Sequence, residues 1–324
     1  MKRVLIIIVF ITVITVIASY KTVNAQQVTL SINPPITELL VKPGKTLLIG
    51  YTIGNIGDPT TLQVKVRSFT PLGDYGESII DNELITPIRF SLDNTDMQFE
   101  TPFFMKQGDV VQALLRIRIP EGVPEGDYYF HFLAVTQPVP AIGGATNSLA
   151  QAIIGSNLLL TVTQKGRTEI KGNIALFSFK PDYILRLFGK EYNIVESLNK
   201  VPITLIVQNQ GKNLIKPEGT ITLTGSLGDK RSYALLSQNV LASSRRLIKV
   251  ENMTDIDPQL TLQLSGNFIG RYDLRADVNF GVGSNTTSSI TSFIGVPIKL
   301  GGSLIMVAII SVMIIISFKK KKSE

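Results

Sequence analysis

Residues 110–136 read VVQALLRIRIPEGVPEGDYYFHFLAVT and decide the fold class. From 115 to 119 apolar residues alternate with arginines, and from Tyr128 to Ala134 aromatic or small apolar residues occupy every second position. This period of two predicts strands with one buried face. The intervening turn, residues 121–127, holds two glycines and one proline, which favour tight changes of direction.

The same pattern recurs about every 10–15 residues along the chain, which is typical of a β-sandwich. The predicted strands lie at 62–66, 158–162, 174–179, 203–207, 220–224, 247–250, 262–264 and 272–280. Only residues 183–189 have a pattern compatible with a helix, of one or two turns. The sequence predicts an all-β protein with two tandem immunoglobulin-like β-sandwich domains at 26–164 and 165–293, joined by a polar hinge at 164–167.

An internal repeat supports two tandem units. Asn55-x-Gly57 and Asn209-x-Gly211 each end an early strand, and each is followed by a late strand that begins with Gly126-Asp127-Tyr128 or Gly270-Arg271-Tyr272. We expect the glycines to allow positive φ angles in these turns. A tyrosine at the start of a late strand predicts a tyrosine corner, in which the hydroxyl bonds to nearby backbone.

Both ends of the chain are strongly apolar. Residues 1–25 combine a basic start, an apolar run and small residues before Gln26, which predicts a cleaved signal peptide; the alternative is an uncleaved anchor. Residues 300–318 carry no charge and, as a helix, would be ~28 Å long, enough for a single transmembrane helix. The lysines of the tail, 319–324, place the C-terminus inside and the ectodomain outside, with 294–299 as a juxtamembrane stalk. The predicted location is the plasma membrane, as a single-pass type I protein.

The net charge of +7 does not indicate a nucleic-acid partner. Seven of the 32 basic residues lie in the first 25 positions and the tail, so the region between them is almost neutral. Binding to a nucleic-acid backbone needs a concentrated basic surface, and no segment supplies one.

Few residues could carry chemistry, because the chain has no Cys, no Trp and one His. His131 has no second His with which to form a metal site, and we expect it on the outer face of a strand, opposite the Tyr128/Phe130/Phe132 face. Asp127 and Glu125 resemble a glycosidase pair, but they are more simply solvated turn residues. The acidic turn 254–258 has too few carboxylates for a calcium loop, and Gly143-Gly144 lacks the rest of a P-loop. We therefore expect no catalytic residue, no cofactor and no metal, and the sequence leaves the binding residues undefined.

Two segments remain open to more than one interpretation. Residues 137–157 are either a plain long hairpin or a flap that contacts a ligand. Residues 179–192, FKPDYILRLFGKEY, are either a contact surface or a loop that covers the core.

The chain resembles the bacterial WxL-interacting protein family. In the N-terminal half the similarity rests on INPP at 32–35, ELLVKPGKT at 38–46 and Asn55-x-Gly57. In the C-terminal half it rests on VPI at 201–203, NQGKNLIKPEGTIT at 209–222, NVL at 239–241, SRR at 244–246 and GRY at 270–272. The resemblance implies a surface protein whose first domain associates with peptidoglycan and whose second binds host or partner proteins.

These observations favour a membrane-anchored surface protein that binds or scaffolds cell wall or secreted proteins through two Ig-like domains, without enzymatic activity. The alternative is a chaperone-like assembly factor that adds an edge strand to secreted subunits. An envelope hydrolase that uses Asp127 and Glu125 is the least favoured hypothesis. The expected partners are the lipid bilayer, peptidoglycan and other surface proteins.

Overall fold

The computed structural model of the protein describes residues 27–137, 151–253, 257–281 and 283–321. The predicted signal peptide, most of segment 137–157 with Gly143-Gly144, part of the acidic turn 254–258 and the end of the tail lie outside these ranges. The described chain consists mainly of strands, which confirms the all-β prediction.

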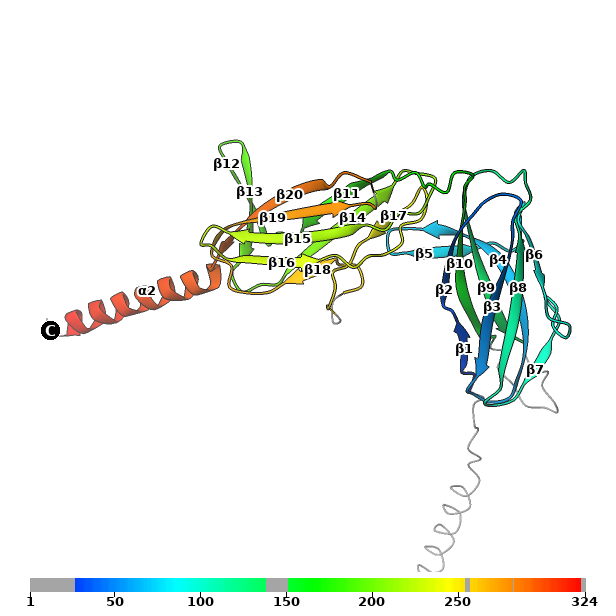
Figure 1. The fold of residues 1–324 in the computed structure, drawn as a ribbon. Coiled ribbons are helices and arrows are strands. Elements are labelled where there is room, and N and C mark those ends of the chain that lie inside the picture. The colour runs from blue at the N-terminus through cyan, green and yellow to red at the C-terminus, as the bar shows by residue number, and fades with distance from the viewer. Residues whose placement is uncertain (1–26, 138–150, 254–256, 282, 322–324) are drawn as a thin grey trace, which may run out of the picture.

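The N-terminal module, residues 30–162, is a sandwich of two sheets (Figure 1). The first sheet has the order β1-β3-β8-β6, with β1 (Leu30–Asn33), β3 (Thr46–Asn55), β8 (Val110–Arg118) and β6 (Arg89–Leu92). The second has the order β2-β10-β9-β4-β5, with β7 on β4; its strands are β2 (Ile36–Val41), β10 (Ile153–Val162), β9 (Gly126–Thr136), β4 (Thr60–Leu72), β5 (Glu77–Ile80) and β7 (Phe103–Met105).

The C-terminal module, residues 172–296, repeats this architecture. Its smaller sheet joins β11 (Gly172–Phe179), β14 (Val201–Asn209), β17 (Arg245–Leu247) and β18 (Leu262–Leu264). Its larger sheet has the order β12 (Tyr183–Leu187), β13 (Lys190–Glu196), β20 (Thr287–Val296), β19 (Gly270–Asn279), β15 (Glu218–Gly225) and β16 (Lys230–Ala234).

In both modules an early segment pairs in parallel with the last strand. The chain leaves β1, which pairs with β3, and crosses at Pro34-Pro35 to β2, which lies parallel to β10. Proline has no N–H to donate, so a strand ladder ends there. In the second module β11 pairs with β14, and β13 lies parallel to β20. The shared pairing supports the internal repeat.

The expected helical turn at 183–189 is wrong. Residues 183–187 form β12, which pairs with β13 across a tight turn at Phe188-Gly189. Both turn residues have positive φ angles, 50° and 75°, as a two-residue hairpin requires. The turn geometry and the pairing with β13 therefore override a short helical pattern.

Each module has its own apolar core, filled by the alternating residues that the sequence indicated. In β8 the buried positions are Ala113, Leu115 and Ile117, and the arginines point outward. Tyr51 of β3 stacks on Phe132 of β9 with ring centroids 4.5 Å apart, which joins the two sheets. In the second module Phe268, Tyr272 and Phe293 form the equivalent aromatic cluster.

The two Asn-x-Gly motifs have the same buried geometry. The side-chain oxygen of Asn55 accepts from the Gly57 N–H at 3.1 Å, and that of Asn209 accepts from the Gly211 N–H at 2.9 Å. The side-chain amide of each asparagine donates to backbone carbonyls of neighbouring segments. Both asparagines are almost fully buried, so these bonds satisfy groups that would otherwise be costly.

The reason for glycine in these motifs differs from the expected one. Positive φ angles occur at Gly126 and Gly270, but Gly57 and Gly211 are not among the positive-φ residues. A Cβ on Gly57 would overlap the Gln27 carbonyl and lie 2.5 Å from the Thr29 nitrogen, and a Cβ on Gly211 would lie 2.9 Å from the Glu169 carbonyl oxygen. Glycine is needed at these sites because the first segment of each module crosses the turn closely.

The tyrosine corner is confirmed at one of the two tyrosines. The hydroxyl of Tyr128 donates to the Pro124 carbonyl oxygen at 3.0 Å. Tyr272 instead has its ring in the core, where it stacks on Phe293 at 5.2 Å. The repeated tyrosine therefore has a different role in each module.

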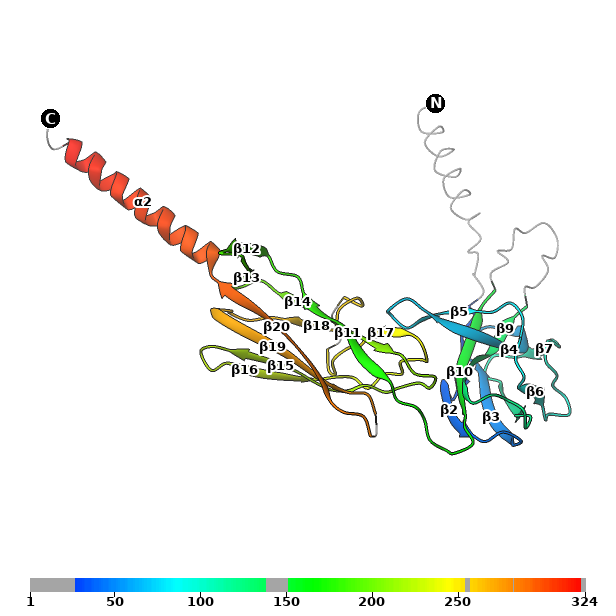
Figure 2. The ribbon, with the colours of Figure 1, turned by 90° about the horizontal axis from the view of Figure 1, so that it is seen from above.

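The strands of the two modules run crosswise, and α2 (Ile298–Lys321) extends from the far end of the C-terminal module (Figures 1 and 2). Searching the described residues reveals no helix with both the length and the apolar character needed to span a bilayer. A helix thus forms over 300–318, but the transmembrane assignment is not supported by this finding and stays a prediction.

Replacing Gly57 with Ala tests the close-approach argument. The added Cβ would displace residues 27–29, and we expect a loss of about 1–3 kcal/mol in the free energy of unfolding, measured by urea denaturation. Gly122→Ala is the control, because a Cβ at Gly122 meets nothing within 4 Å. Equal stability of the two variants would contradict the argument.

Candidate functional site

The carboxylate of Asp127 joins the two modules. It lies at the start of β9, and its Oδ1 accepts from Thr161 Oγ1 at 2.8 Å and from Asn213 Nδ2 at 2.9 Å. Its Oδ2 accepts from the Tyr129 hydroxyl at 2.8 Å and from the Leu214 N–H at 2.5 Å. Two of these donors belong to the N-terminal module, and two belong to the loop after β14. One side chain therefore fixes that loop against β9 and β10.

The interpretation of Asp127 as a solvated turn residue is therefore wrong. Its four hydrogen bonds use the acceptor positions that a catalytic base would need. Glu125 is exposed, but its Oε1 accepts from the Gln164 N–H at 2.5 Å and so holds the hinge. Both carboxylates have structural contacts, which counts against the glycosidase-pair hypothesis.

A second polar contact lies beside the first. Glu38 of β2 forms an ion pair with Lys216 at 2.6 Å and accepts from Asn239 Nδ2 at 2.6 Å. Burial by itself would raise the pKa of Glu38, but the hydrogen bonds from Lys216 and Asn239 and the charge of Lys216 together lower it. The carboxylate is therefore ionised at neutral pH and continues the contact begun at Asp127.

The β4–β5 hairpin makes the third contact between the modules, and Figures 1 and 2 show it reaching toward β17. The Asp74 carbonyl accepts from the Leu247 N–H at 2.6 Å, and the Asp74 carboxylate pairs with Arg245 at 3.2 Å. The Arg246 guanidinium packs on Gly76, where a Cβ would lie 2.8 Å from its Cζ. A side chain at position 76 would therefore push the arginine away.

A groove of about 260 Å³ lies between these contacts, and we call it the inter-module groove. The N-terminal module contributes its β2, β4, β9 and β10 strands to the walls, and the C-terminal module contributes residues 238–246. The residues that define its chemistry are Ile36, Phe69, Leu72, His131, Asn157 and Arg246. The groove is apolar on one side and has amide, imidazole and guanidinium groups on the other.

His131 lies on the outer face of β9, opposite the buried Phe130 and Phe132, as expected. Its ring stacks on Phe69 with centroids 4.1 Å apart. Burial lowers the pKa of His131 and outweighs the opposing effect of a hydrogen bond with Asn157. The imidazole is therefore neutral at pH 7 and contributes shape and a polar edge rather than charge.

Arg246 supplies the positive charge of the groove. Among the described residues its one hydrogen bond runs from Nη1 to the Asn239 carbonyl at 2.7 Å, although guanidinium carries five N–H donors. Burial lowers the pKa of Arg246 from its ordinary value, which reflects the cost of holding this charge away from water. A carboxylate in the groove would satisfy the remaining donors in a forked geometry.

A second, wider depression of about 710 Å³ lies on the other side of the Glu38–Lys216 pair. Leu159 borders both depressions, and Lys216 and Glu218 line the wider one. The inter-module groove is smaller than a typical small-molecule pocket, so its volume suits one or two side chains of a partner. No group of acidic or His side chains that could hold a metal ion occurs in the described part of the chain.

The two open segments have different outcomes. Most of 137–157 lies outside the described residues, so its role stays open. Residues 179–192 include the β12–β13 hairpin, whose large apolar side chains are exposed. The structure therefore favours a contact surface over a core-covering loop for this segment.

The comparisons with known proteins assign no family. No protein-family model matches the sequence, and no curated protein matches it. A class 5 fimbriae chaperone, CfaA, has a TM-score of 0.37 and 11% identity, over 83% of this chain and 100% of that one. The CsuC–CsuE chaperone–tip subunit complex of Acinetobacter baumannii (83% of this chain, 99% of that one) and the Salmonella enterica SafB chaperone with the SafA pilin (83% and 99%) each have a TM-score of 0.35 and 11% identity. None names a WxL-interacting protein, so that resemblance stays a prediction.

Asp127→Asn tests the contact between the modules. The new amide would place N–H groups against the donors of Asn213 or Leu214, at a cost of about 1–3 kcal/mol. We expect faster trypsin cleavage of the native chain at Lys165 and Arg167 in the hinge, by roughly tenfold or more. Glu125→Gln is the control, since its amide oxygen can still accept from Gln164. An unchanged cleavage rate in Asp127→Asn would rule out the proposed role.

The pKa of His131 can be measured directly, because the chain has one histidine. We expect its ring proton resonance to titrate with a midpoint below the ordinary value of 6.5. The unfolded chain then binds the proton more readily, so stability is full above pH 6.5 and falls as the pH drops through the folded-state pKa. His131→Gln should remove this dependence from urea denaturation curves. A midpoint at or above 6.5 would contradict the burial argument.

Proposed function

We propose that this protein is an exported surface protein that binds a partner protein in the inter-module groove and is tethered through residues 300–318. The observation that carries the proposal is the half-buried Arg246 guanidinium, which lines a groove too small for most metabolites and has one hydrogen bond in the described chain. The tether is supported by the uncharged run and the lysines that follow it. No enzymatic activity is proposed.

The partner should present a carboxylate flanked by apolar side chains. Arginine binds carboxylates through two parallel N–H donors, and a cation that has already lost water on folding gains more from such a pair than an exposed one does. Phe69, Leu72 and Ile36 offer apolar contact on the opposite side of the groove. Binding by shape and one charge suits a protein segment, in keeping with the expected scaffolding of secreted proteins.

Site-specific cross-linking tests this function. A photoreactive residue at Ser78, which lines the groove, should trap one envelope protein in intact cells, and the same residue at the exposed Ile85 should not. Arg246→Ala should weaken binding of the purified partner by roughly 30-fold, as expected for a buried arginine anchor. Arg271→Ala, an exposed arginine on β19, is the matched control. A partner that binds Arg246→Ala normally would overturn the proposal.

A chaperone-like role is the second candidate, and an open strand edge favours it. The β10 residues 153–156 pair with β9 on one side, but β2 begins its pairing only at Asn157. No described residue pairs with the other side of 153–156, and Ile153 is exposed there. Such an edge can accept an added strand from a client protein.

The added strand would have an alternating signature. Cross-linkers at successive positions from 153 to 156 should trap a client with a period of two, because side chains alternate across a strand. A client trapped at Ser78 but at none of these positions would favour groove binding. A client trapped here in alternation, with normal binding to Arg246→Ala, would favour strand addition.

A further inference from the structure

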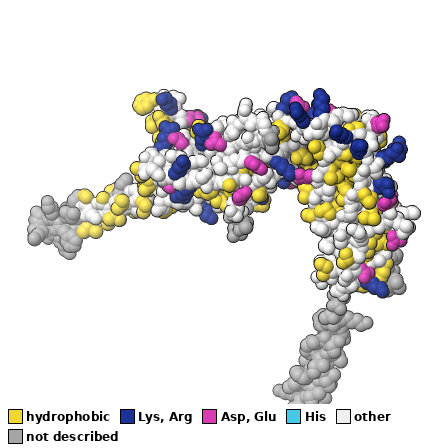
Figure 3. All heavy atoms as spheres, in the orientation of Figure 1, with side chains coloured by type: hydrophobic (Ala, Val, Ile, Leu, Met, Phe, Trp, Pro, Cys, Tyr) yellow, Lys and Arg dark blue, Asp and Glu magenta, His cyan; other side chains and the backbone are white. Residues whose placement is uncertain are grey.

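The β12–β13 hairpin is the most apolar exposed element of the C-terminal module. Its exposed side chains include Tyr183, Ile184, Leu185, Leu187 and Tyr192, which come from both faces of the hairpin. The side chain of Phe188 at the tip is fully exposed, at 101%. Figure 3 shows hydrophobic atoms at the end of this projection with basic groups beside them.

The tip places an aromatic side chain where the backbone disfavours one. Phe188 has φ 50°, a left-handed conformation that Asn or Gly adopts more readily in such turns. No ring contact of Phe188 occurs among the described residues to offset this cost, and its exposure shows that the side chain is not packed. Strained, exposed positions of this kind point to function rather than to folding.

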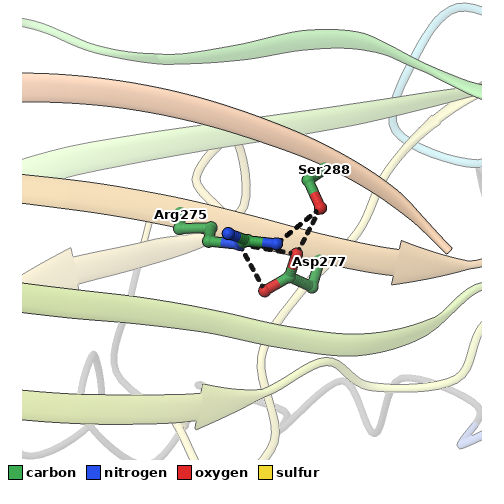
Figure 4. A network of polar contacts seen from close by, with 3 residues as sticks. All are labelled: Arg275, Asp277 and Ser288. Atoms are coloured by element: carbon green, nitrogen blue, oxygen red, sulfur yellow. Dashed lines mark hydrogen bonds and ion pairs between the residues drawn. The ribbon is translucent and has the colours of Figure 1, made fainter.

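The rest of the same sheet has a polar outer face. On β19, Arg275 donates to Asp277 at 2.8 Å and to Ser288 of β20 at 3.1 Å, and Ser288 donates to Asp277 at 2.5 Å (Figure 4). Arg271 and Asp273 form a similar pair one turn of the pleat away. These strands are suited to water, so the apolar character of the hairpin is specific to it.

The base of the hairpin is tied to the start of α2. The last residues of β13, Ile194–Glu196, pair in parallel with the last residues of β20, Ile294–Val296, and α2 begins two residues later. The Lys299 N–H donates to Glu196 Oε2 at 3.2 Å, and the Lys299 ammonium donates to Asn199 at 3.3 Å. Figures 1 and 2 both show the hairpin at the end of the module from which α2 leaves.

Helix α2 and the hairpin share the same kind of surface. The described apolar side chains of α2, which are Leu304, Met306, Val307, Ile309, Ile310, Val312, Met313 and Ile314, are all exposed. They occur on all sides of the helix, so a single protein face would leave many of them in water. A lipid phase would cover them all, and the hairpin lies beside its expected boundary.

From this placement we infer that the tip of the β12–β13 hairpin inserts into the interfacial region of an anionic phospholipid bilayer. Phe188 and the neighbouring aliphatic side chains enter the acyl boundary, and Tyr183 and Tyr192 lie at headgroup level. Arg186 and Lys190 flank the tip and attract lipid phosphates. The inference rests on the proposed tether, and the hairpin would give the C-terminal module a second contact with the same membrane.

The absence of Trp from the sequence allows a direct test. Phe188→Trp introduces one indole at the tip of the full-length chain. The variant is reconstituted in vesicles of phosphatidylglycerol and phosphatidylcholine, with or without brominated phosphatidylcholine. We expect emission at shorter wavelength than in detergent-free buffer and roughly twofold or greater quenching by the brominated lipid. Ile85→Trp, an exposed apolar site in the N-terminal module, should show neither effect.

The outcomes separate the hairpin from the tether. Vesicle flotation reports the tether, and quenching of the indole at position 188 reports the hairpin. Flotation without quenching would overturn the hairpin inference alone, and loss of both would overturn the tether as well. A wavelength shift that grows with protein concentration without lipid would assign the tip to a second copy of the chain and overturn the inference. Adding Lys190→Glu should reduce quenching in anionic vesicles, while Arg271→Glu should not.

Discussion

The relative position of the two sandwiches depends on the Asp127 carboxylate. Thr161 and Tyr129 hold this side chain from its own module, and Asn213 and Leu214 bind it from the other. Tyr129 extends the network, because its hydroxyl also accepts from the Ala242 N–H at 2.8 Å. Burial raises the pKa of Tyr129, and the charge of Asp127 raises it further, so the phenol stays protonated and able to donate. The groove exists because this network sets the distance between its walls.

Both modules solve one packing problem with the same residues. In each, the first segment crosses the end of an early strand so closely that only glycine fits at Gly57 and Gly211. A buried asparagine two positions earlier satisfies the backbone groups that this crossing would leave unpaired. The late-strand tyrosines show that the repeat tolerates change elsewhere, since Tyr128 bonds to backbone and Tyr272 fills the core. The motif therefore fixes a crossing point rather than a whole surface.

Local sequence signals predicted the strands well and the site poorly. Alternation identified β8, β9, β14 and β19, because the burial of every second side chain is written into neighbouring residues. The roles of Asp127 and Arg246 could not be read in the same way. Their partners lie 86 residues away at Asn213 and in another strand pair at Gly76, and the sequence gives no sign of such distant contacts. Arg246 and Glu38 entered the sequence analysis only as members of family motifs.

The way in which α2 leaves the C-terminal module determines how the module would respond to mechanical load. Strand β20 runs straight into the helix and lies between β13 and β19. A pull along the helix would therefore act along the strand, and the ladder bonds on both sides would have to shear together rather than open one by one. Bonds loaded in parallel share the force, so the junction would resist detachment during flow or growth of the cell envelope. The hinge at residues 164–167, which has fewer such bonds, would yield first.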